Sequence, residues 1–125
     1  MCKSKTLFLA ILLHVLISAA TLTANAQAGN SYAAMASPDQ YLISDVNSEI
    51  ALARSAAPPS ISDNADVMVL GPSGFKTAVQ GTNGFLCLVE RSWGASTDFP
   101  EFWNPKIRAP HCFNPQAAKT FAPFS

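Results

Sequence analysis

The distribution of hydrophobic residues separates the first 26 positions from the rest of the chain. Residues 7–17 form an almost unbroken apolar run, which two lysines precede and the small-residue sequence Ala24-Asn25-Ala26 follows. This order is typical of a cleaved export signal. The run is about half the roughly 20 residues that a membrane-spanning helix needs. We therefore expect residues 1–26 to be a signal peptide and the mature chain to begin at Gln27.

A helical pattern follows residues 27–36, a stretch without periodicity that we expect to be a flexible leader. Within residues 41–57, apolar side chains recur at spacings of three and four from Leu42 to Ala57, which predicts one amphipathic helix. Ser37 and Pro38 supply a start signal before it, and the prolines after residue 57 end it. Ser44-Asp45 is a second start signal, so a break near this point stays open.

Three strands are predicted next, over residues 66–70, 75–80 and 85–93. Four-residue turn sequences separate them, and the second of these contains Asn-Gly, a strong hairpin signal. The three strands should form an antiparallel meander. One face of this meander is the surface available to the apolar stripe of the helix.

Regular patterning ends at residue 94. Four prolines, at positions 100, 105, 110 and 115, exclude a helix or a central strand through this aromatic-rich segment. Asn114 can cap a last short helix over residues 116–121. The predicted fold is therefore α+β: one N-terminal helix on a three-stranded antiparallel meander, then an irregular segment and a short C-terminal helix. Residues 37–125 would form this single small domain. Its apolar end leaves two alternatives open: the terminal rings pack back on the sheet, or the domain is incomplete.

Charge excludes two classes of partner. Once the signal peptide is removed, eight acidic residues remain against six basic ones, and the basic residues form no cluster. Nucleic-acid-binding domains carry clustered lysine and arginine, and membrane-surface segments are basic and amphipathic. We therefore expect neither nucleic acid nor, after signal cleavage, a membrane as partner.

Cysteine usage agrees with export. Cys2 is lost with the signal, which leaves Cys87 and Cys112. An even number of cysteines in an oxidising compartment favours a disulfide, although two separately buried thiols are the alternative. Closing a loop of this length would stabilise the domain by about 3 kcal/mol.

The aromatic-rich segment supplies the candidate ligand site. Trp93 and Trp103 lie among the polar residues Arg91, Glu101 and His111. Exposed aromatic rings beside polar groups can stack on sugars or peptides. The alternative is that the rings fill the core beneath an irregular loop.

Enzymatic chemistry has weaker support. Acid–base catalysis would have to use Glu90, Glu101 or His111, and a nucleophile and orienting group for it cannot be assembled from the sequence. A thiol nucleophile beside His111 is disfavoured, because adjacent residues rarely meet in catalytic geometry and an oxidising compartment consumes the thiol. A zinc site would need ligand spacings that the chain lacks. We therefore expect no cofactor, no metal and no catalytic residue, and a non-enzymatic binding protein. The alternative is a hydrolase-like enzyme or fragment of one.

Four strings of the sequence resemble a family of bacterial exported proteins of unknown function. They are EIALARSAAPPSIS at residues 49–62, GTNGFLCLVERSW at 81–93, EFWNPK at 101–106 and APHCFNP at 109–115. The resemblance covers residues 49–119. It implies a periplasmic or secreted protein, and a chain that is a short or C-terminally truncated member. It implies no activity, cofactor or site residue.

Overall fold

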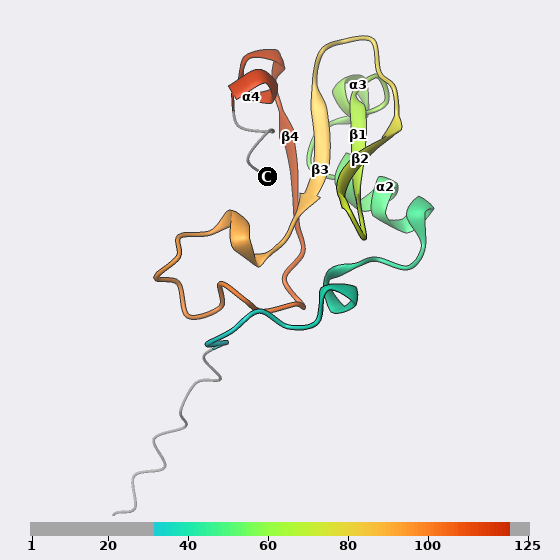
Figure 1. Ribbon diagram of the computed structural model, residues 1–125. Helices are drawn as coiled ribbons and strands as arrows, with labels where there is room; N and C mark the ends of the chain where they lie inside the picture. The colour runs from blue at the N-terminus through green and yellow to red at the C-terminus, as the bar shows by residue number, and fades with distance from the viewer. Residues whose placement is uncertain (1–31, 121–125) are drawn as a thin grey trace, which may run out of the picture.

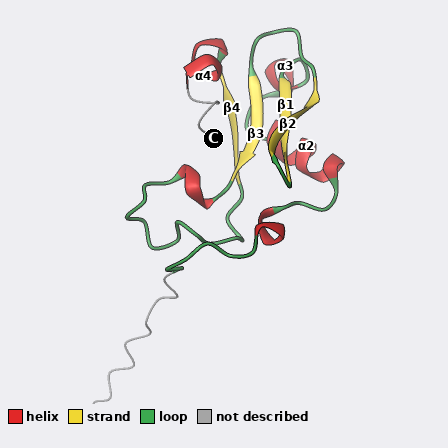
Figure 2. Ribbon diagram, in the orientation of Figure 1, coloured by secondary structure: helices red, strands yellow, loops and turns green. Residues whose placement is uncertain are grey.

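A four-stranded sheet lies at the centre of the structure, a computed structural model that describes residues 32–120 (Figure 1). The spatial order is β2-β1-β3-β4, with bounds β1 (Asp66–Gly71), β2 (Gly74–Val79), β3 (Leu86–Glu90) and β4 (Ala109–Phe113). Short helices surround the strands (Figure 2). The α+β class is therefore correct. The expected signal peptide, the first five residues of the leader and the apolar chain end lie outside the described residues.

Strands β1 and β2 form the first expected hairpin. They pair antiparallel, with Leu70 opposite Phe75, and their bounds lie within one residue of the prediction. The turn between them ends at Gly74, whose φ of 110° is a conformation that glycine adopts without the strain a Cβ would cause. The turn sequence and the alternating pattern together were sufficient to predict this unit.

The predicted meander is wrong, because β3 does not return beside β2. Strand β3 pairs in parallel with the other side of β1. The loop over residues 80–85 instead crosses the beginning of β1. There the Thr82 amide donates to the Asn64 carbonyl at 2.8 Å, and the Gly81 amide donates to Asp66 Oδ1 at 2.7 Å.

Gly81 allows the loop to pass close to the chain at the beginning of β1. A Cβ on Gly81 would overlap the backbone of Asn64 and Ala65, so only glycine allows the loop to pass so closely. The Asn-Gly sequence that suggested a hairpin is compatible with either path, and the packing of the loop over β1 decides between them.

Strand β4 lies in the segment expected to be irregular. It pairs antiparallel with β3, placing Cys112 opposite Cys87 and Pro110 opposite Val89. Proline cannot donate a ladder hydrogen bond, but β4 is at the edge of the sheet, where this is tolerated. The third expected strand is shorter than predicted, and the chain after it forms a single 3₁₀ turn, η2 (Ser92–Gly94).

The single helix predicted over residues 41–57 is also wrong. The chain forms a 3₁₀ turn, η1 (Pro38–Tyr41), and then α2 (Val46–Arg54). The N-cap of α2 is Asp45, whose carboxylate accepts a 2.9 Å hydrogen bond from the Ser48 amide. The second of the two start signals therefore begins the α-helix.

The break follows from a competing partner for one carbonyl. In a continuous helix the Tyr41 carbonyl would accept from the amide four residues later. Here it accepts from the guanidinium of Arg91 at 2.7 Å, and the next residue, Leu42, is extended with ψ of 150°. A contact fifty residues away in sequence thus ends the first turn.

Helix α2 packs on β1, β3 and β4 and covers the hydrophobic core. Its Ala53 is fully buried against Val67, Cys87 and Val89. The predicted disulfide joins Cys87 to Cys112. The covalent link therefore lies between two strands and beneath the helix.

Two further short helices complete the described fold, α3 (Pro59–Ser62) and α4 (Pro115–Thr120). The expected cap of the last helix is present, since Asn114 Oδ1 accepts from the Ala117 amide at 2.8 Å. The short C-terminal helix is confirmed, although its expected last residue lies outside the described residues. No helix among residues 32–120 is long and apolar enough to cross a membrane.

Candidate functional site

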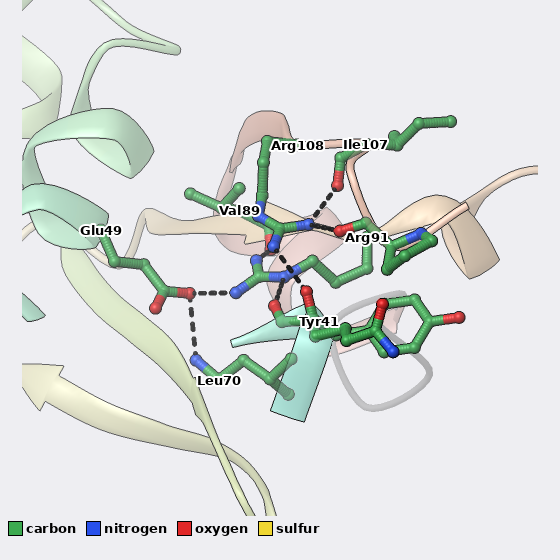
Figure 3. A network of polar contacts seen from close by, with 9 residues as sticks. Tyr41, Glu49, Leu70, Val89, Arg91, Ile107 and Arg108 are labelled. Carbon is green, nitrogen blue, oxygen red and sulfur yellow. Dashed lines mark hydrogen bonds and ion pairs between the residues drawn. The ribbon is translucent and has the colours of Figure 1, made fainter. Parts of the chain in front are cut away.

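A buried arginine organises the end of the sheet where the irregular segment begins. Arg91 follows β3, and its side chain has no exposed surface. Its Nη2 donates to Glu49 Oε1 at 2.8 Å, its Nε donates to the Tyr41 carbonyl at 2.7 Å, and its Nη1 donates to the Val89 carbonyl (Figure 3). One side chain thus joins α2, η1 and β3.

Glu49 completes this network from α2. Its side chain is 1% exposed, and Oε1 also accepts a hydrogen bond from the Leu70 amide on β1 at 3.1 Å (Figure 3). A buried ion pair is tolerated when further hydrogen bonds satisfy both partners, as they do here. Arg91 was a candidate ligand contact in the sequence; the structure encloses it, so its role is to position the surrounding segments.

A second arginine extends the network to the irregular segment. Arg108 Nη1 donates to the carbonyls of Pro105 at 2.6 Å and Ile107 at 2.8 Å, and Nη2 donates to the Gln40 carbonyl at 3.3 Å. Partial burial lowers the pKa of Arg108 from its ordinary value, and the neighbouring charge of Arg91 lowers it further. The guanidinium stays protonated and fastens the end of this segment to η1.

Tyr41 connects the polar network to the aromatic residues. Its hydroxyl donates to the Trp103 carbonyl at 2.7 Å and accepts from the Ala36 amide at 3.2 Å. Its ring packs on that of Trp93, with centroids 4.8 Å apart and a tilt of 52°. Tyr41 is 1% exposed and contacts three of the residues predicted for the site: Arg91, Trp93 and Trp103.

A pocket of about 320 Å³ opens beside this aromatic pair. Its walls come from the chain before η1, from η1 itself, from the β1–β2 turn and from η2. The lining is mostly apolar, and its members are Met35, Pro38, Asp39, Tyr41, Leu42, Leu70, Gly71, Pro72, Gly74 and Trp93. A concave apolar site with few polar groups is the usual form of a small-molecule site, and this volume is at the lower end of the common range.

The remaining predicted site residues make their contacts elsewhere. Glu101 accepts a hydrogen bond from the Asn104 side chain, and the Trp103 ring packs edge-on against Phe102. His111 lies on β4 with its side chain 51% exposed, and its Nδ1 lies 2.8 Å from Glu90 Oε2. Of the five predicted ligand-binding residues, only Trp93 lines the pocket.

The Glu90–His111 pair has a chemistry of its own. A carboxylate close to one ring nitrogen can orient the imidazole, and it leaves the other nitrogen available to solvent. The Glu90 carboxylate passes close to Gly94, where an added Cβ would stand 2.7 Å from Oε2. The hydrogen bonds of residues 32–120 join His111 to no hydroxyl or thiol, and both described cysteines form the disulfide.

Sequence reasoning missed Tyr41, Asp39 and the contribution of the β1–β2 turn. The apolar stripe used to predict the helix began at Leu42 and therefore passed over Tyr41. The two helix start signals in the sequence were the available indication. Two separate starts imply an extended link between two helices, and a backbone carbonyl before that link that lacks a helical hydrogen-bond partner.

Among the described residues, no group of three or more histidine, cysteine or acidic side chains is arranged to hold a metal ion. Comparison of the chain with protein families, with curated proteins and with solved structures finds no match. The functional assignment therefore rests on the geometry of the Tyr41–Trp93 pocket.

Proposed function

We propose that this protein is an exported, non-enzymatic binding domain whose ligand inserts an apolar group into the pocket beside Trp93. The observation that carries the proposal is the pocket itself, whose walls come from segments far apart in sequence. The Arg91 side chain donates to the Tyr41 carbonyl and pairs with Glu49, which accepts from the Leu70 amide, so hydrogen bonds join the walls and the pocket is preformed. Preformed sites lose less conformational entropy when a ligand binds.

Three observations support export. The first 26 residues have the order of a cleaved signal, and disulfides such as Cys87–Cys112 persist in oxidising compartments. The resemblance to bacterial exported proteins points the same way. The test is expression of the full chain in a bacterium, followed by fractionation and mass analysis. We expect a product that begins at Gln27 outside the cytoplasm; intact chain in the cytosol would contradict export.

Calorimetric titration with a neutral aromatic alcohol, 2-phenylethanol, tests the pocket. Trp93→Ala removes one wall, whereas Trp103→Ala removes a ring of the same size that does not line the pocket. Loss of one large apolar contact should weaken binding by about tenfold. We expect this loss in Trp93→Ala and near-native binding in Trp103→Ala. Equal binding by Trp93→Ala and the unmodified protein, or no binding to either, would overturn the proposal.

One observation favours a second candidate function, an acid–base enzyme of hydrolase type. It is the 2.8 Å contact between Glu90 and His111, which leaves one imidazole nitrogen accessible. A panel of ester and glycoside substrates tests it, with His111→Asn as the inactivating variant and Glu101→Gln as the control. Turnover that His111→Asn abolishes would establish the enzyme. No turnover across the panel would leave the binding domain as the supported proposal.

A further inference from the structure

We infer that the ligand of the Trp93 pocket is an organic cation: an amine with an apolar body, whose ammonium group pairs with Asp39. This inference rests on the proposed function, because it names the ligand class of the same pocket. Two features of the lining carry it, one electrostatic and one aromatic.

Asp39 is the one charged residue among those that line the pocket. It is exposed, and its carboxylate accepts a hydrogen bond from the neighbouring Ser37 hydroxyl. Neither of the ion pairs within residues 32–120 includes it. An unneutralised carboxylate beside an apolar cavity attracts a cation and repels an anion.

The aromatic walls favour the same charge. Trp93 lines the cavity and is partly exposed, while Tyr41, which is 1% exposed, packs against the Trp93 ring. The faces of aromatic rings carry negative electrostatic potential and attract ammonium groups, and tryptophan does so most strongly. A neutral ligand would gain only the apolar contacts, whereas a cation would gain these contacts, the attraction of the Trp93 ring and the pairing with the carboxylate.

The nearby cations do not reverse this selection. The guanidinium of Arg91 is enclosed and paired with Glu49, and that of Arg108 is bound to three carbonyls. Lys76 does not line the pocket, although its Cε comes within 3.8 Å of where a Cβ on Gly71 would stand. Its flexible ammonium can turn to solvent.

Three probes of similar size and different charge test the inference: 2-phenylethylamine, 2-phenylethanol and 3-phenylpropanoate. In calorimetric titrations near neutral pH, we expect the amine to bind about fivefold more tightly than the alcohol. The carboxylate should bind most weakly. Added salt should reduce the advantage of the amine, because salt screens the pairing with an exposed carboxylate.

Asp39→Asn keeps the shape of the side chain and removes its charge. It should reduce the advantage of the amine to the twofold or so that cation–aromatic attraction alone provides. Asp98→Asn is the matched control, because Asp98 is also exposed, also accepts from a serine hydroxyl two residues earlier, and lies outside the pocket. We expect this control to bind all three probes as the unmodified protein does.

The outcomes separate the inference from the proposed function. If the alcohol binds as tightly as the amine, or if Asp39→Asn keeps the full preference, the cation is wrong and the apolar pocket stands. If the carboxylate binds best, Lys76 governs the site and the inference is again wrong. If none of the probes binds, the proposed function fails, and this inference fails with it.

Discussion

The disulfide and the buried ion pair connect the same fold in opposite ways. Cys87–Cys112 is covalent and apolar, and it joins β3 to β4, two strands that the sheet ladder already pairs. The contacts of Arg91 are non-covalent and polar, and they join α2, η1 and β3, which no ladder holds together. The covalent link therefore reinforces a local pairing, whereas the ion pair determines how separate segments meet.

This difference also separates the core from the proposed site. The disulfide lies under α2 in the hydrophobic core, where Cys112 Sγ comes within 3.7 Å of the Ala53 carbonyl oxygen. The ion pair lies beside the pocket, because its Tyr41 and Leu70 partners are both lining residues. We therefore expect loss of the ion pair to affect ligand binding, and loss of the disulfide to affect mainly stability.

The largest effect should come from removing the charge of Glu49. Glu49→Gln leaves the Arg91 guanidinium buried without a counter-ion, which we expect to lower the free energy of unfolding by about 3–5 kcal/mol. Urea unfolding followed by tryptophan fluorescence measures this change. The exposed Asp63→Asn is the control and should change stability by less than about 0.5 kcal/mol.

A double variant tests whether the loss comes from the unpaired charge. Glu49→Leu combined with Arg91→Met removes both charges and fills similar space, so it should be more stable than Glu49→Gln. If Glu49→Gln unfolds at the same urea concentration as Asp63→Asn, the ion pair contributes little, and the contrast with the disulfide disappears.

Reduction of the disulfide should have the second largest effect. The bond closes a loop with a sequence separation of 25, and its loss should lower the free energy of unfolding by about 3 kcal/mol. The comparison is between oxidised and reduced protein, with two additional thiols counted after reduction under denaturing conditions. Because the β3–β4 ladder remains, we expect the reduced protein to fold and to bind 2-phenylethanol with unchanged affinity.

Loss of that binding on reduction would remove the distinction between the two links. A Cys87→Ala/Cys112→Ala variant provides an independent check, because it does not expose the protein to reductant. It should match the reduced protein in ligand affinity and fall somewhat below it in stability, since it also removes the sulfur atoms of the buried Cys87 and the partly buried Cys112.

The contrast explains which parts of the structure the sequence could predict. The disulfide was predictable because only two cysteines remain after the signal peptide, so each has one possible partner. The β1–β2 hairpin and the cap at Asn114 were predictable because they depend on neighbouring residues alone. The parallel pairing of β3 with β1, the additional strand β4 and the break after Tyr41 depend on contacts between distant segments. Local patterns contain no information on such contacts.

In the candidate site, too, local features were predictable and long-range contacts were not. Trp93 was predicted because its type and its surroundings are visible in the sequence, and it does line the pocket. Arg91 was predicted as a ligand contact because it is a polar residue close in sequence to the aromatic residues. Its burial requires Glu49, forty-two residues earlier, to reach the same point, which only the three-dimensional arrangement provides.

Tyr41→Phe should have a smaller effect and tests how far the polar network extends. It keeps the ring against Trp93 and removes the hydroxyl that donates to the Trp103 carbonyl. Loss of this hydrogen bond should lower the free energy of unfolding by about 1 kcal/mol. Hydrogen exchange at the Ala36 amide should also become faster, because that amide donates to the same hydroxyl.

Tyr32→Phe is the matched control for the missing hydroxyl. The interaction that ties Tyr32 to the irregular segment is made by its backbone amide, which donates to the Pro100 carbonyl at 3.2 Å. This variant should unfold at the same urea concentration as the unmodified protein. Equal exchange rates at Ala36 in Tyr41→Phe and in the unmodified protein would show that the network ends at Arg91.

The smallest effect should be the acid dependence of α2, the helix that carries Glu49. The hydrogen bonds of Ser48 hold the pKa of Asp45 below its ordinary value of 3.8. A carboxyl group with a lowered pKa in the folded state stabilises that state above its unfolded pKa, and the contribution is lost as the pH falls through the folded value. The free energy of unfolding should therefore decline below about pH 4 more steeply in the unmodified protein than in Asp45→Asn, which caps the helix without titrating.

Urea unfolding at several acidic pH values measures both curves, and Asp63→Asn should follow the unmodified protein. Parallel curves for Asp45→Asn and the unmodified protein would mean that the hydrogen bonds of Ser48 do not favour the ionised form of Asp45.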